Sequence, residues 1–230
     1  MTIALPTNTY IFASMQDETL EKIAFLFLGW LLGLLAPVIV NAINRRREDD
    51  LGRKAIKTEL AGLKVKLAIA YHSIAEHQGT MTRQSLQWIA NQLSAAPSDD
   101  EALAVSATLK KLLDASDDQF HQFFLRMKSK PGRSLTLQKY GTPLLDARVS
   151  ALWSFDDDTQ RTLLEIRSAL DIASEVVDRA RHFANLTFQK LENGNHALAV
   201  ENVEDCYRQY AQQAKRIVSL IERFESSPTR

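Results

Sequence analysis

The chain has 230 residues, and its 28 basic residues balance 28 acidic ones, so net charge favours no class of partner. Apolar residues make up 45%, which is ordinary for a globular chain, so a membrane segment must be recognised locally. Cys206 is the only cysteine, which excludes an intramolecular disulfide and a zinc-thiolate cluster. Glycine and proline are scarce, and that scarcity favours long helices over a strand-rich fold.

The longest uncharged run is residues 23–43, IAFLFLGWLLGLLAPVIVNAI. A helix needs roughly 20 apolar residues to cross the hydrocarbon core, and a spanning helix tolerates a proline such as Pro37. Acidic residues precede the run and Arg45, Arg46 and Arg47 follow it, which is the reverse of the pattern of a cleaved signal peptide. We therefore expect an uncleaved single-pass anchor.

The same charge asymmetry predicts a topology. Basic residues stay on the cytoplasmic side of a membrane, so Arg45, Arg46 and Arg47 should lie there and contact lipid headgroups. We expect residues 1–22 to form a short extracytoplasmic tail and residues 44–230 to be cytoplasmic. The localisation predicted is the bacterial inner membrane.

Gly29 and Gly33 lie four residues apart within the predicted anchor. Small residues at this spacing let two membrane helices approach closely, so the pair predicts dimerisation or a larger homo-oligomer. A pair that faces lipid and has no function fits the same residues.

After the anchor, residues 44–80 are expected to form a basic juxtamembrane segment and a helical stalk. One apolar stripe recurs along it at steps of three and four, which indicates an amphipathic helix. The residues of this stripe are Ile56, Leu60, Leu63, Leu67, Ala70 and Ile74.

Residues 81–230 are predicted to be a cytoplasmic helical domain. Helices are expected over 82–93, from 101 to about 113, from 117, after Pro143, from 157 and from 195. The last two keep long apolar stripes and are joined by a short glycine turn, which predicts an antiparallel helix hairpin. The predicted fold class is all-α: one N-terminal transmembrane helix, then a helical bundle. Residues 128–143 are the one irregular stretch, and only Leu135-Thr136-Leu137 suits a strand.

Four acidic clusters are candidates for metal or catalytic sites. Each is expected to lie where a helix begins, where negative charge complements the helix dipole and the free amides, so helix capping is favoured over a metal. The clusters are Asp49-Asp50, Asp99-Asp100, Asp117-Asp118 and Asp156-Asp157-Asp158.

Other catalytic patterns are missing from the sequence. His72, Glu76 and His77 do not match a zinc-protease motif, and histidines on helix surfaces are the preferred explanation. No nucleophile elbow or phosphate loop occurs, and acidic neighbours should raise the pKa of Cys206. We therefore expect a non-enzymatic protein without cofactor or metal.

Positive charge gathers in one place. No acidic residue occurs from 119 to 145, while five basic residues do. A flexible basic loop with hydroxyls and free amides suits phosphate or carboxylate groups, and nearby aromatic rings would stack on a nucleotide base. A solvated loop, or one resting on anionic lipid, is the alternative. The predicted ligand-binding residues are Arg126, Lys128, Lys130, Arg133, Lys139 and Tyr140.

The layout resembles a group of small bacterial membrane-anchored proteins with a helical cytoplasmic region, many of them encoded near phage-defence genes. The resemblance rests on the anchor at residues 23–43, the arginine triplet that follows it, and the segment TPLLDARVSALWSFDDDTQRTLLEIRSAL at residues 142–170. The group includes CRISPR ancillary membrane proteins that sense cyclic oligoadenylate. The resemblance implies a similar signal here, but no motif carries binding residues over.

The sequence thus predicts a membrane-anchored effector that binds an anionic ligand, oligomerises, and acts at the membrane. The resemblance implies that the ligand is a cyclic nucleotide and that the effector serves antiviral defence. The alternative is a structural adaptor that tethers a cytoplasmic protein partner to the inner membrane. A third reading is a helical enzyme acting on lipid or nucleotide. A basic ligand loop favours the first, an exposed apolar patch the second, and a pocket of titratable groups the third.

Overall fold

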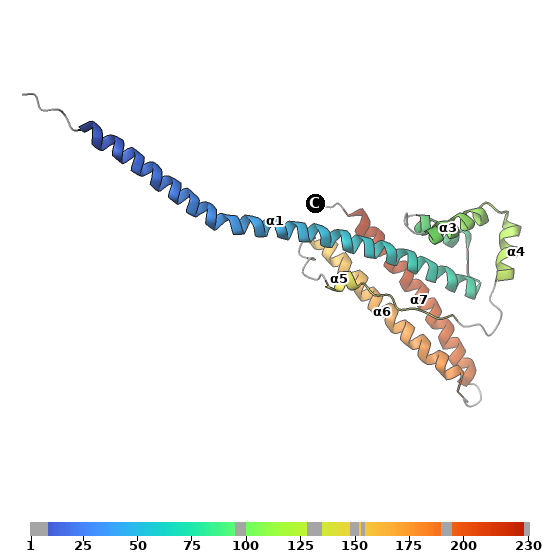
Figure 1. The fold of residues 1–230 in the computed structure, drawn as a ribbon. Coiled ribbons are helices and arrows are strands. Elements are labelled where there is room, and N and C mark those ends of the chain that lie inside the picture. The colour runs from blue at the N-terminus through green and yellow to red at the C-terminus, as the bar shows by residue number, and fades with distance from the viewer. Residues whose placement is uncertain are drawn as a thin grey trace, which may run out of the picture. The chain divides into compact units, whose positions relative to one another are not determined.

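The structure is a computed structural model that describes residues 9–94, 100–127, 135–147, 152, 155–189 and 195–227. The described residues form helices and contain no strand, as the sequence predicts (Figure 1). The helices are α1 (Thr9–Gln78), α2 (Arg83–Ser94), α3 (Asp100–Leu113), α4 (Asp117–Met127), α5 (Pro143–Ala147), α6 (Asp157–Thr187) and α7 (Asn195–Ser226).

The first helix, α1, is 70 residues long and runs through Pro37 and Gly52 without a break (Figure 1). Its apolar part has a mean hydropathy of 2.6 and no buried residue, so α1 is long and apolar enough to cross a membrane. It is the one such helix in the described part of the chain. The helix begins before the predicted span and continues into the predicted stalk. Asp49 and Asp50 therefore lie inside a helix, and the prediction that they mark a helix start is wrong.

The chain divides into two compact units, one up to Leu51 and one from Gly52 to the C-terminus. In the second unit, the part of α1 from Gly52 onward packs in a large apolar core with α6 and α7. The predicted stalk stripe supplies the α1 side of this core, because Ile56, Leu60 and Leu67 are all almost fully buried. The stripe is therefore occupied within the chain and is not free for self-association.

A second, smaller apolar cluster joins α1 to α2 and α3. Val65 and Ala75 of α1 pack there with Leu86 and Leu93 of α2 and with Leu109 of α3. The half-buried Tyr71 and Trp88 contact both clusters, and their rings meet edge to face at 5.3 Å. The domain part of α1 thus has one core on each side.

Two predicted helix starts are confirmed by their hydrogen bonds. Before α4, the Gln119 amide donates to Ser116 Oγ at 3.3 Å, and the Ser116 amide donates to Gln119 Oε1 at 3.2 Å, which is a capping box. Before α6, Asp156 is the N-cap and accepts from the Thr159 amide at 3.0 Å. Asp99 lies outside the described residues, and Asp100 begins α3.

The polypeptide between α4 and α5 is extended where the structure describes it. Residues 135–140, called the strap below, carry no strand, so Leu135-Thr136-Leu137 is not a strand. Leu137 is buried in the large core, and Leu135 and Tyr140 pack against it. At the far end of this segment, Glu59 of α1 accepts the amides of Leu144 and Leu145 at 2.8 and 2.9 Å and thereby satisfies the free N–H groups at the start of α5.

Candidate functional site

Two tyrosines of α7 hold the strap by its backbone. The Tyr207 hydroxyl donates to the Leu135 carbonyl at 2.7 Å and accepts from the Leu135 amide at 2.9 Å. The Tyr210 hydroxyl donates to the Gln138 carbonyl at 2.9 Å. An extended segment without a strand partner needs other groups to satisfy its backbone, and here buried phenol hydroxyls supply them. The strap is thus fixed to α7 at two points.

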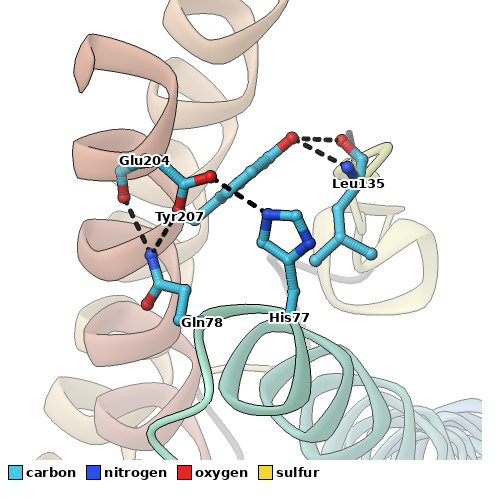
Figure 2. A network of polar contacts seen from close by, with 5 residues as sticks. All are labelled: His77, Gln78, Leu135, Glu204 and Tyr207. Carbon is cyan, nitrogen blue, oxygen red and sulfur yellow. Dashed lines mark hydrogen bonds and ion pairs between the residues drawn. The ribbon is translucent and has the colours of Figure 1, made fainter. Parts of the chain in front are cut away.

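The last turn of α1 meets the same place on α7 (Figure 2). His77 Nε2 lies 3.0 Å from Glu204 Oε1, and Gln78 Nε2 donates to Glu204 Oε2 at 3.0 Å and to its backbone carbonyl at 3.1 Å. The His77 ring stands edge to face on the Tyr207 ring, with centroids 5.4 Å apart. Glu204 and Tyr207 are one helical turn apart, so the end of α1 and the start of the strap share one turn of α7.

Burial keeps the two tyrosine hydroxyls that bind the strap protonated. It raises the pKa of the Tyr207 phenol, and Glu204 and Cys206 raise it further, while the hydrogen bond from the Leu135 amide lowers it. Burial likewise raises the pKa of Tyr210, with a further contribution from Tyr140. Both hydroxyls therefore stay protonated near neutral pH and remain able to donate to the strap.

Cys206 lies between these groups in the sequence but offers no reactive thiolate. Its side chain is buried, and burial raises its pKa, opposed by the Arg179 guanidinium. The direction agrees with the sequence analysis, but the cause is burial rather than the neighbouring acidic residues. The thiol is a packing group of the core.

The structure places only part of the predicted ligand set. Lys139 Nζ lies 2.6 Å from Asp178 Oδ2 of α6, and Tyr140 is half-buried, with its pKa raised by burial. Both lie at the end of the strap. Arg126 belongs to α4, but its side chain lies outside the described residues. Lys128, Lys130 and Arg133 also lie outside them. Ligand binding by this set stays a prediction.

The predicted membrane-facing residues lie on α1 in the first unit. Gly29 and Gly33 are exposed, and a Cβ added at either would meet no atom within 4 Å, so each leaves room for a neighbouring helix. Arg45, Arg46 and Arg47 are exposed along the same helix. Dimerisation and headgroup contact remain predictions.

Two of the histidines differ from the expectation, whereas His182 and His196 are exposed on helices as expected. The His77 side chain is only 9% exposed, and the His72 side chain 25%, so neither is a plain surface residue. Their periodic position on α1 gave no sign of this, because burial depends on helices that come far later in the sequence. Among the described residues, no group of three or more His, Cys, Asp and Glu side chains is arranged to hold a metal ion.

Sequence reasoning missed the role of Tyr207 and Tyr210. Both fit the apolar stripe of the last predicted helix by their spacing, and both are indeed in the core. The available signal was their hydroxyl groups, since a buried tyrosine nearly always has a hydrogen-bond partner. The strap that they bind lies more than sixty positions earlier in the chain. It has no periodic pattern from which its position could be predicted.

Comparison of the chain with protein-family models, with curated proteins and with solved structures found no match.

Proposed function

We propose that this chain is a non-enzymatic effector anchored in the bacterial inner membrane, with its N-terminus outside and its helical domain in the cytoplasm. The domain binds an anionic ligand of the cyclic-oligonucleotide class through the basic residues that precede the strap and through Lys139 within it. It is a helical bundle in which α6 and α7 form an antiparallel hairpin. Ligand binding alters the oligomer formed by the anchors, and the protein acts at the membrane, as an antiviral defence effector does.

One observation carries the proposal: the strap and the end of α1 are bonded to the same turn of α7. Leu135, the first residue of the strap, is bonded to Tyr207. Glu204, one turn earlier, is bonded to His77 and Gln78 at the end of α1. A ligand that displaces the strap therefore acts on the contacts that hold α1, and α1 is the same helix that carries the apolar span. These contacts give the signal a physical route.

The adaptor function has separate support. Phe188, Leu198 and Val200 are exposed apolar side chains around the end of α6 and the start of α7, where a protein partner would find apolar contact. An adaptor would bind its partner with or without a nucleotide. The two functions therefore differ in what the basic residues do.

Binding of cyclic tetra- and hexa-adenylate to the full chain in lipid nanodiscs tests the ligand. We expect binding that weakens with salt, because each contact to phosphate is charge-assisted. Lys130→Glu should abolish it, whereas Lys110→Glu, an exposed lysine of α3, should not. Loss of affinity for anionic vesicles in Lys130→Glu, with no soluble ligand bound by either protein, would instead assign the loop to lipid.

Tyr207→Phe tests the route. This variant should bind the nucleotide but fail to change oligomeric state in response, because the strap is no longer bonded beside Glu204. Tyr210→Phe releases the strap at Gln138, away from the end of α1, and should respond. A normal response from Tyr207→Phe would contradict transmission through this turn.

A further inference from the structure

A hollow of about 340 Å³ lies between α1, α3 and α4, away from the strap. Its wall is mostly apolar and includes Val105, Leu109 and Leu112 of α3 and Phe123 of α4. The volume is at the lower end of the range of roughly 300–1,000 Å³ that small-molecule sites occupy. Size and lining therefore suit a small, largely apolar molecule.

One wall of the hollow is polar. His72 and Glu76 lie one turn apart on α1, with His72 Nδ1 3.7 Å from Glu76 Oε2, which is too long for a hydrogen bond. Neither side chain makes a hydrogen bond to any other described residue. Each is 25% exposed. The pair thus presents to the hollow an imidazole and a carboxylate that are not hydrogen-bonded to another described residue.

The charge of this pair is negative near neutral pH. Burial lowers the pKa of His72, while Glu76 raises it by a smaller amount, so the imidazole is mainly neutral. A neutral imidazole nitrogen and a carboxylate both accept hydrogen bonds. Among the lining residues that the structure describes there is no lysine or arginine. A bound anion would be repelled by Glu76, whereas a cation with N–H donors satisfies both acceptors.

We propose that the hollow binds a small apolar amine. Its hydrocarbon part lies against Leu109, Leu112 and Phe123, and its ammonium group donates to Glu76 and to the imidazole of His72. This site is independent of the proposed anionic ligand, because none of the described lining residues belongs to the predicted ligand-binding set and the charge of the ligand is opposite. The bound amine ties α3 and α4 to α1 and stabilises the folded domain by mass action.

The test uses the full chain in detergent and three probes of one shape: 2-phenylethylamine, 2-phenylethanol and phenylacetate. Calorimetric titration should show that the amine binds at least tenfold more tightly than the alcohol, and that phenylacetate does not bind. Glu76→Gln should weaken the affinity for the amine about tenfold or more, since a charge-assisted hydrogen bond is lost, and should leave the affinity for the alcohol nearly unchanged.

A matched pair of variants locates the binding. Ala104 lines the hollow and Ala107 lies on the same helix outside it, and both are exposed. Ala104→Trp should abolish amine binding, and Ala107→Trp should retain it, with equal melting temperatures for the free proteins. Equal affinities for amine and alcohol, an unchanged affinity in Glu76→Gln, or equal loss in both tryptophan variants would overturn the proposal. Failure of the nucleotide to bind would leave it intact.

Discussion

The hydroxyl of Tyr207 meets both backbone polar groups of Leu135, as donor to its carbonyl at 2.7 Å and as acceptor from its amide at 2.9 Å. A single side-chain atom thus replaces the two backbone bonds that a neighbouring strand would supply. The strap is held in place by tertiary contacts rather than by secondary structure.

Tyr207→Phe should lower the free energy of unfolding by about 1–3 kcal/mol, because it leaves the half-buried amide and carbonyl of Leu135 without a partner. Tyr210→Phe removes one bond and should cost about 1 kcal/mol. Urea unfolding of the full chain in detergent measures both. An equal loss of unfolding free energy in the two variants would mean that water replaces the Tyr207 hydroxyl at Leu135.

The ion pair between Lys64 of α1 and Glu225 of α7 is the most buried one described, with the Lys64 side chain 9% exposed and the two charged atoms 2.6 Å apart. Glu225→Leu leaves the Lys64 ammonium group without its partner and should lower the free energy of unfolding by about 1–3 kcal/mol. Lys64→Met should change stability by less than about 1 kcal/mol, since an apolar side chain replaces the buried charge.

The control is the exposed pair of Glu165 and Arg223, which joins α6 to α7. Glu165→Leu should cost at most about 1 kcal/mol. A cost for Glu225→Leu no larger than this would show that Lys64 reaches solvent when its partner is removed.

Asp156 gives the domain a pH dependence on the acid side. The amide and hydroxyl of Thr159 donate to its carboxylate and lower its pKa. A depressed folded pKa stabilises the fold above the unfolded value of about 3.9, and this stabilisation is lost as pH falls through the folded pKa. Asp156→Asn keeps an acceptor but cannot ionise, so its melting temperature should fall less between pH 5 and about pH 2. Parallel curves for the two proteins would contradict this role.

Cys206 should resist maleimide at pH 8 until the protein unfolds, because its side chain is buried and its pKa raised. Native Cys206 therefore cannot report membrane topology. In a Cys206→Ala background, Thr7→Cys should be labelled in intact spheroplasts, and the exposed Ser168→Cys only after permeabilisation. The reverse pattern would overturn the predicted orientation.

Gly29→Ile with Gly33→Ile should reduce the oligomer mass in detergent, because branched side chains keep two helices apart. Ala24→Ile is the control, since at 100° per residue it projects from the side of α1 away from both glycines. The domain should melt at the same temperature in all three proteins. An unchanged mass would show that the glycines face lipid, leaving any oligomer to the cytoplasmic domain.

The helical class and the apolar N-terminal helix were predictable because both depend on local periodicity and composition. The starts of α4 and α6 were predictable for the same reason, since Ser116 with Gln119 and Asp156 with Thr159 bond within one turn. The prediction of a helix start at Asp49 and Asp50 was wrong because two adjacent acidic residues can also lie inside a helix. The strap, the burial of His77 and the hollow beside His72 depend on contacts between distant segments, which no local pattern encodes.

Because the large core joins residues of α1 to residues of α7, it cannot form until the ribosome has synthesised α7. Lys64 and Glu225 are 161 residues apart, and at about 5–20 residues per second the ribosome needs roughly eight to thirty seconds to pass from one to the other. During that interval the apolar stripe of α1 is made but uncovered, while the segment before it is already apolar enough to enter a bilayer. Membrane insertion would then precede domain folding, and the nascent chain would be a client for chaperones at the membrane surface.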